Sequence, residues 1–267
     1  MNKVFSHARI LVLPAILCLA FTLNAGAQQI DYVIHDRTSA EKSAASPLDA
    51  LTPEQIGILE KLNRVNAARL KRLANVVLPA AWVDDENAYS PFPQEWIWAI
   101  DKPKAIVVDQ VAQAFAAYEY GRLTRWGPVS TGSLGQTPSG SFTLSWRSRG
   151  HRSSIDPSWY LEWYFNFIPS RGIAFHKYSL PGQAASHGCV RMLERDAQWL
   201  YQWGDPPSKG VKGTPVVVLG CPDRNKEWHS ASFLQQGIAL PDAPPSTVMN
   251  CQAYSGSTPA TQRKTIR

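Results

Sequence analysis

Short apolar segments, separated by turn residues, follow one another from Lys104 to Leu219 and limit the folds open to the chain. Such a succession is typical of a barrel or a sandwich of strands. One helix is expected among them, over LERDAQWLYQW, because Gly204 and Pro206 end it. The expected strands are AIVVD, AFAAYE, RLTRWGPVST, SFTLSW, WYFNFIP, GIAFH and TPVVVL. The pattern predicts a mostly β domain with few helices, built as a β-sandwich or barrel.

The first 27 residues predict export from the cytoplasm. A basic segment, MNKVFSHAR, precedes the apolar run ILVLPAILCLAFTL and the small residues that end at Ala27. This order is typical of a secretory signal peptide. A lipid-modified Cys18 and an uncleaved anchor are alternatives, but Leu17 is large for the first, and the run is shorter than the roughly 20 residues of a spanning helix. The expected location is the periplasm or cell wall, with no membrane span after cleavage.

Export makes the cysteines informative, because disulfides persist outside the cytoplasm. Removal of Cys18 leaves Cys189, Cys221 and Cys251, and an odd number leaves one thiol unpaired. Cys221 and Cys251 can pair and tie the C-terminal extension to the domain, which would leave Cys189 free. The sequence does not decide this pairing.

Cys189 lies in FHKYSLPGQAASHGCVRM, and four roles are open to it: disulfide partner, zinc ligand, buried structural thiol or nucleophile. A zinc site would combine His176, His187 and Cys189, but the paired spacing typical of such sites is absent. A nucleophile fits the residue types best. A thiol pKa of about 8.5 requires an imidazole or backbone N–H groups to favour the thiolate, and His176 can supply the imidazole. Gly188 allows a sharp turn that directs backbone N–H groups at a carbonyl oxygen.

SHGCVRM, with the upstream AFH and VSTG…TPSGSF, resembles the catalytic domain of L,D-transpeptidases, which remodel bacterial peptidoglycan. The resemblance covers roughly Lys104 to Gly220. It implies that a peptidoglycan stem peptide acylates Cys189 and that His176 is the general base. It implies no metal and no cofactor.

The resemblance also assigns supporting residues. Ser186, His187 and Gly188 would shape the site and its oxyanion hole. Arg191 would be a structural residue or one that orients the substrate. The family often has Gly or Ser after the histidine, whereas this chain has Lys177. The backbone carbonyl of Lys177 is therefore expected to orient His176.

The basic and aromatic stretch WRSRGHRSSIDPSWYLEWYFNF offers further substrate contacts. Arg147, Arg149 and Arg152 can pair with stem-peptide carboxylates, and Trp159, Tyr160 and Trp163 can wall the groove, with Lys177 as a further candidate. The alternative is a solvated basic loop followed by core aromatics.

The region before the β domain begins with a helix signal at Thr52, followed by Pro53 and Gln55. Two short helices and the strand VVLP are expected. EKLNRVNAARLKRLANVVLP faintly resembles part of a LysM wall-binding repeat, but a small helical subdomain that packs on the main domain is favoured. The expected parts are a signal peptide (1–27), a linker (28–51), the small helical subdomain and connector (52–100), the L,D-transpeptidase-like catalytic domain (101–222) and a largely disordered extension (223–267).

The expected function is an exported transpeptidase that forms a thioester on Cys189, releases D-alanine and transfers the stem to an amine. A second stem, a lipoprotein lysine or water can be the acceptor. An inactive wall-binding module and a thiol carboxypeptidase or amidase are the rival functions. The 27 Lys and Arg only slightly outnumber the 21 Asp and Glu, and no dense basic run indicates nucleic-acid binding.

Overall fold

The computed structural model describes residues 30–37, 47–222 and 237–251 of the chain. The expected signal peptide lies outside the described residues, as do residues 223–236 and 252–267 of the C-terminal extension. In the part of the chain that is described, no helix has the length and apolar character needed to cross a bilayer.

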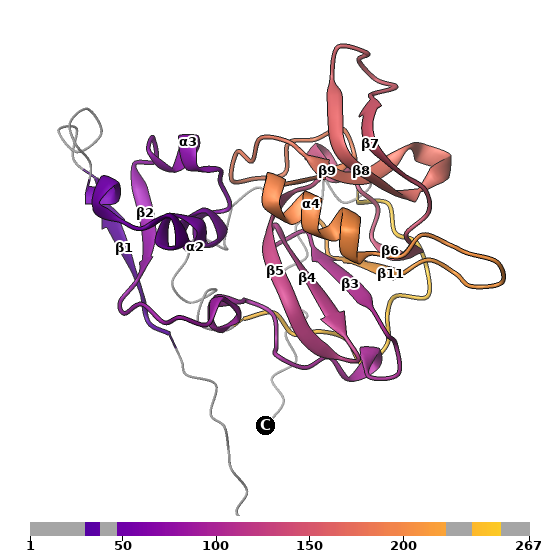
Figure 1. Ribbon diagram of the computed structural model, residues 1–267, viewed down its shortest axis with the longest axis horizontal. Coiled ribbons are helices and arrows are strands. Elements are labelled where there is room, and N and C mark those ends of the chain that lie inside the picture. Colours follow the sequence, from indigo (N-terminus) through magenta and orange to yellow (C-terminus); the bar gives the residue numbers. More distant parts are fainter. Residues whose placement is uncertain (1–29, 38–46, 223–236, 252–267) are drawn as a thin grey trace, which may run out of the picture.

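A curled sheet of nine strands forms the main body, with the order β6-β11-β3-β4-β5-β10-β9-β8-β7 (Figure 1). β6 also contacts β8, so the sheet bends round on itself. The expectation of a mostly β fold is confirmed. The strands are β3 (Ala105–Asp109), β4 (Ala114–Glu119), β5 (Arg122–Ser130), β6 (Gly140–Thr143), β7 (Arg147–Arg152), β8 (Tyr160–Ile168), β9 (Ile173–Lys177), β10 (Val190–Met192) and β11 (Pro215–Leu219).

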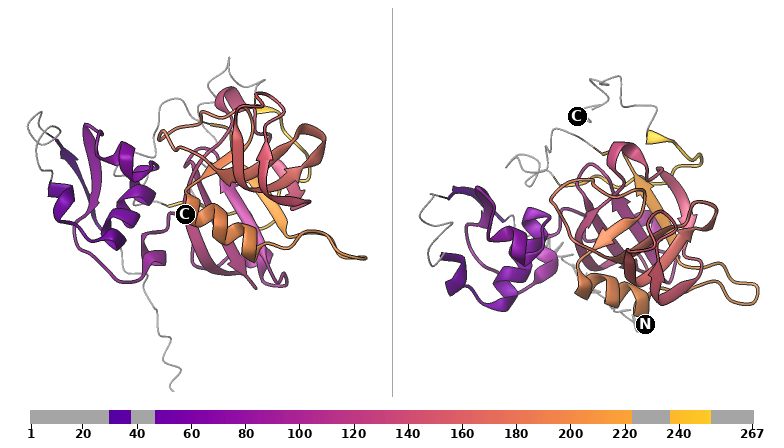
Figure 2. Two further views of the ribbon diagram at one scale, coloured as in Figure 1. Left: turned by 45° about the horizontal axis from the view of Figure 1, so that its top comes forward. Right: turned by 90° about the horizontal axis from the view of Figure 1, so that it is seen from above.

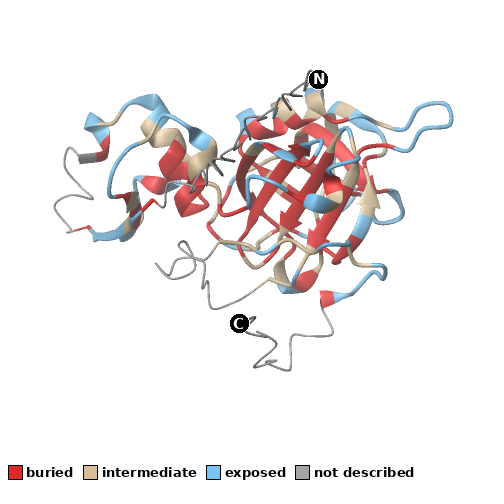
Figure 3. Ribbon diagram, turned by 90° about the horizontal axis from the view of Figure 1, so that it is seen from below, coloured by how far each residue is buried: buried red, intermediate tan, exposed pale blue. Residues whose placement is uncertain are grey.

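Alternate side chains of β3 and β4 enter two different cores, as the period of two in a strand requires. Ile106 and Phe115 belong to the core enclosed by the curled sheet. Val107 and Ala116 face outward and share a second core with the N-terminal part of the chain. Both faces of these strands are therefore buried, as Figure 3 shows.

The helix expected after Cys189 is α4 (Glu194–Trp203), and it packs against β8 and β9. Ala197 and Leu200 are its buried apolar residues, and Gly204 follows as its C-cap. The helix closes the enclosed core and holds β9, which carries a candidate catalytic residue.

The N-terminal subdomain contains β1 (Tyr32–Asp36), α2 (Pro53–Asn63), α3 (Ala67–Leu70) and β2 (Asn75–Pro79) (Figure 2). Thr52 and Gln55 form the expected capping box at the start of α2. The expected unit of two helices and the strand VVLP also contains a second strand, in the segment that was expected to be a linker. β1 lies within residues 28–51 and pairs antiparallel with β2. YVIHD has little apolar alternation, so the strand depends on its distant partner NVVLP for its backbone hydrogen bonds.

The N-terminal subdomain is docked on the sheet by buried cations at the end of α2. Lys61 donates to the carbonyl oxygen of Trp126 over 2.6 Å, and Arg64 donates to that of Ala112 over 2.8 Å. Both side chains are buried, and both lie near the Trp126 ring. Burial of charged groups is costly unless they are paired, so these contacts fix one docking geometry.

The described C-terminal residues form a strap across the sheet edge. Cys221 and Cys251 form the disulfide that was one of the two expected outcomes, and Cys189 is the free thiol. Met249 pairs with Ser139 in an isolated antiparallel bridge. The strap therefore lies next to the segment that leads into β6.

Candidate active site

Strands β9 and β10 are parallel neighbours, and this pairing brings the two principal residues together. Val190 lies opposite Phe175, and Arg191 lies opposite His176. Cys189 directly precedes β10, so it lies beside Ala174, near the start of β9. One pocket is lined by Ser153, Ile155, Trp159, Leu161, His176, Tyr178, Ser186, His187, Cys189 and Arg191.

His176 is held in one orientation and one protonation state. Its ring Nδ1 lies 2.9 Å from the carbonyl oxygen of Lys177, which confirms the expected orienting group. A carbonyl only accepts hydrogen bonds, so Nδ1 carries the proton and donates it, and Nε2 retains a lone pair. Burial lowers the pKa of His176 to about 4; the hydrogen bond to the Lys177 carbonyl raises it by less, and the charge of Arg191 adds a smaller lowering. The imidazole is therefore neutral at pH 7 and can accept a proton on Nε2.

Cys189 is partly buried, and its resting form is the thiol. Burial raises its pKa, while a hydrogen bond with the Ala174 backbone and the charge of Arg191 lower it by less. Its Sγ donates to the carbonyl oxygen of Gly172 over 3.6 Å. The free site thus pairs a neutral thiol with a neutral imidazole.

Gly188 sets the backbone direction at the nucleophile. Its φ of +127° lies in a region that side chains with a Cβ rarely adopt. The Thr137 hydroxyl donates to the Gly188 carbonyl oxygen over 2.6 Å. Because a trans peptide places C=O and N–H on opposite sides, this bond directs the Cys189 N–H away from Thr137. The arrangement supplies one fixed donor of the kind that an oxyanion hole requires.

Ser186 and His187 occupy different positions around this turn. Ser186 is buried, and its hydroxyl donates to the Cys189 carbonyl oxygen and accepts from the Gly188 N–H over 3.1 Å. His187 is exposed, with its ring centroid 5.3 Å from that of Trp159. Ser186 therefore shapes the turn, and His187 forms part of the pocket wall.

Arg191 lies over the ring of Tyr178 in the wall of the pocket. Its guanidinium carbon is 4.6 Å from the centroid of the Tyr178 ring, within the range of a cation–π contact. It lines the pocket together with Cys189 and His176. A fixed positive charge here favours the thiolate and disfavours the imidazolium.

Four of the side chains suggested as substrate contacts do not line the pocket of Cys189. Trp163 is buried in the enclosed core, and Arg149 stacks on it at 3.7 Å. Tyr160 lines a different hollow. The Lys177 ammonium pairs with Glu162 over 2.6 Å and with Glu194 over 3.1 Å.

Strand geometry explains the position of Tyr160. Side chains alternate along β8, so Trp159 and Leu161 face the pocket, while Tyr160 and Glu162 face the other side. A positive φ of 57° at Trp163 then interrupts the alternation. The basic segment before β8 is not a solvated loop, because Arg147–Arg152 forms strand β7 at the sheet edge.

Several site residues were missed by sequence reasoning. Tyr178 follows His176 by two positions, which is the strand period and the available signal for it. Thr137 was identified only as part of the motif TPSGSF. Tyr164 donates to the Gly172 carbonyl oxygen over 3.0 Å, the same oxygen that Cys189 contacts. No spacing in the sequence indicates either contact.

Among the described residues, no group of three or more His, Cys, Asp or Glu side chains is arranged to hold a metal ion. The site instead has the parts of a thiol acyl-transfer centre: a cysteine, a neutral base and a fixed backbone donor.

Comparison with known families gives the class of this domain. Residues 103–218 match the family model described as YkuD, L,D-transpeptidase catalytic domain. The match confirms the resemblance that the Ser-His-Gly-Cys motif predicted.

Solved structures that resemble the chain are L,D-transpeptidases. One from Stackebrandtia nassauensis is 28% identical over 45% of this chain and 57% of its own, with a TM-score of 0.39. One from Xylanimonas cellulosilytica is 25% identical over 61% of this chain and 78% of its own, with a TM-score of 0.41. L,D-transpeptidase 3 from Mycobacterium tuberculosis, solved with a faropenem-derived adduct, is 22% identical over 44% of this chain and 60% of its own, with a TM-score of 0.36.

The chain thus spans less than two thirds of the first of these proteins. None of the curated proteins compared with the sequence matches it.

Proposed function

We propose that the protein is an exported peptidoglycan L,D-transpeptidase whose nucleophile is Cys189. The observation that carries the proposal is the pairing of this thiol with a neutral His176 in one pocket of a domain that matches the family model. The family match supports an acyltransferase, and the substrate and mechanism below are inferred from the site.

The first half-reaction forms a thioester. The Cys189 proton moves to Nε2 of His176 as the sulfur attacks the carbonyl carbon of the diamino acid at the third stem position. The Cys189 N–H donates to the developing oxyanion. The tetrahedral intermediate then collapses, the bond to D-alanine breaks, and His176 returns its proton to the leaving amine.

The second half-reaction transfers the stem. The acceptor amine attacks the thioester carbonyl while His176 takes its proton, and the Cys189 thiol is restored when that proton moves to sulfur. The acceptor is a second stem, a lipoprotein lysine or, for simple trimming, water. Each acceptor leaves a different product from the same acyl-enzyme.

A muropeptide assay tests the proposal. Purified tetrapeptide stems are incubated with the wild-type protein, Cys189→Ala and His176→Gln, and D-alanine release and cross-linked products are measured. Wild type should release D-alanine, and both variants should lose at least about a hundredfold in rate. Release at the parental rate by Cys189→Ala would defeat the mechanism.

Mass spectrometry after exposure to a carbapenem separates the enzyme from an inactive wall-binding module. An enzyme gives one covalent adduct, mapped to Cys189, and an inactive module gives none. A thiol hydrolase would give the adduct but only trimmed products from muropeptides.

A further inference from the structure

A groove between the N-terminal subdomain and the catalytic domain adjoins the active-site pocket. Tyr178 lines both the pocket of Cys189 and a larger hollow beside α3 and α4. That hollow shares Asn66, Ala68 and Ser179 with a third hollow on the other side of α3. The three hollows therefore follow one another along residues 178–180, and we call the second and third together the interdomain groove.

The walls of the interdomain groove are held in place by direct contacts. Arg195 of α4 forms an ion pair with Glu60 and donates to the Gly57 carbonyl oxygen over 3.1 Å. Val65 forms an antiparallel bridge with Pro181, just beyond the shared residues. With the buried contacts of Lys61 and Arg64, these bonds fix both sides of the groove, so it exists before any ligand binds.

The charge in the groove changes along its length. The hollow next to Tyr178 is lined by three carboxylates, Glu60, Glu162 and Glu194, and two cations, Lys177 and Arg195. All five take part in ion pairs with one another, which leaves an excess of one negative charge.

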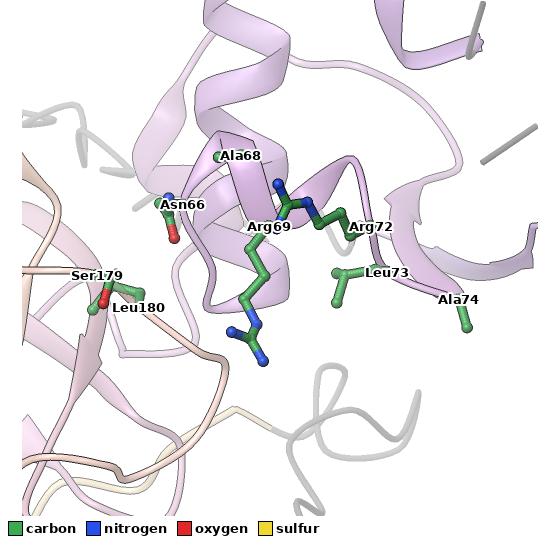
Figure 4. Close-up of a pocket in the computed structure, with 8 residues that line it drawn as sticks. All are labelled: Asn66, Ala68, Arg69, Arg72, Leu73, Ala74, Ser179 and Leu180. Atoms are coloured by element: carbon green, nitrogen blue, oxygen red, sulfur yellow. The ribbon is translucent and has the colours of Figure 1, made fainter. Parts of the chain in front are cut away.

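The far hollow has the opposite charge. The described residues that line it include Arg69 and Arg72, and none of them carries a carboxylate. Both arginines are exposed, and Figure 4 shows the Arg69 guanidinium extending from α3 toward the gap beside Ser179 and Leu180. Guanidinium groups in such a position bind carboxylates well because they present parallel N–H donors.

We infer that the interdomain groove binds the stem peptide that supplies the acceptor amine, and that Arg69 and Arg72 bind its carboxylates. This inference rests on the proposed function and identifies the second substrate. The order of charges matches such a peptide: the negative section nearest the active site suits the amine, and the positive section farther away suits the terminal carboxylate.

An acceptor assay with a charge-matched control tests the inference. Arg69→Ala/Arg72→Ala is compared with Lys209→Ala/Lys212→Ala, which removes two exposed cations from the loop before β11. The donor tetrapeptide is held constant, and cross-link formation is measured against acceptor concentration, with a free carboxylate or a terminal amide on the acceptor.

The arginine variant should raise the acceptor KM roughly tenfold and should lose the preference for the free carboxylate. Its rate of carbapenem acylation should equal that of wild type, because the acylation uses only the Cys189 pocket. The lysine variant should behave as wild type in both assays.

An unchanged acceptor KM in the arginine variant, or an equal rise in both variants, would overturn the inference. A separate measurement distinguishes this from failure of the proposed function. Stem tripeptide is titrated into Cys189→Ala while the Arg69 and Arg72 side-chain N–H signals are followed by NMR. Saturable shifts support the groove even if wild type transfers nothing, and their absence contradicts it.

Discussion

Removal of the Cys221–Cys251 disulfide should both destabilise the protein and slow its acylation. The disulfide spans a sequence separation of 30 residues. Loop-closure entropy for a loop of that length corresponds to about 3.5 kcal/mol of stability. Cys221→Ser/Cys251→Ser should lower the free energy of unfolding by that amount.

The effect on acylation follows from the contact between Cys251 and the loop that holds the nucleophile. A Cβ added to Gly135 would lie 2.4 Å from the Cys251 Cβ, so the two backbones are in direct contact. Two residues later, Thr137 fixes the Gly188 carbonyl and thereby the Cys189 N–H. Loss of the disulfide releases this support, and we expect acylation to slow about tenfold, because small misplacements of catalytic groups are costly.

The assay is carbapenem acylation by stopped flow, together with urea unfolding. Serine is a suitable replacement at position 251, because the sulfur lies 3.4 Å from the Gly220 carbonyl oxygen and 3.7 Å from the Gln110 amide nitrogen, so a hydroxyl finds partners. Ser141→Ala is the control: it removes a 2.7 Å bond to the Pro245 carbonyl oxygen of the same strap and leaves the disulfide intact.

Two results would refute the reasoning. If the double variant is destabilised but is acylated at the wild-type rate, the disulfide does not support the active-site loop. If it unfolds at the same urea concentration as wild type, the entropy argument is wrong for this strap.

Three further predictions concern the site itself. Carbapenem acylation should persist on acidification to about pH 5 and fall as His176 protonates near pH 4, and a titration near pH 6.5 would contradict the assigned base. The unfolded chain binds that proton more readily, so the free energy of unfolding should drop by about 3 kcal/mol between pH 6.5 and 4. In His176→Gln, urea unfolding should show a drop that is smaller by this amount. Gly188→Ala should lower the free energy of unfolding by about 1–3 kcal/mol through backbone strain. It should also abolish acylation, since the new Cβ would meet the Ile173 side chain at 3.3 Å. A variant that is still acylated in the stopped-flow assay would disprove the role of the turn. Lys177→Ala should retain the wild-type acylation rate, because the backbone carbonyl and not the ammonium orients His176, and a loss above tenfold would favour a side-chain role.

Sequence patterns predicted the strands whose apolar residues are continuous or alternate. AIVVD and AFAAYE coincide with β3 and β4, and the Thr52 capping box starts α2 as expected. Strands β1 and β7 were missed, because neither alternates apolar and polar residues regularly, and each is fixed by its pairing with β2 or β8.

The sequence by itself predicted the candidate reacting groups and the resemblance to L,D-transpeptidases. A free thiol after Gly188, a histidine at the end of a strand and two other cysteines able to pair are properties of local chemistry and of count. Tertiary structure decided what surrounds them. Parallel pairing of β9 with β10 brought His176 to Cys189, Thr137 came from a distant loop, and the alternation of β8 put Trp159, not Tyr160, in the pocket. Such contacts depend on strand register and on which face of a strand each side chain takes, and a single bulge changes both.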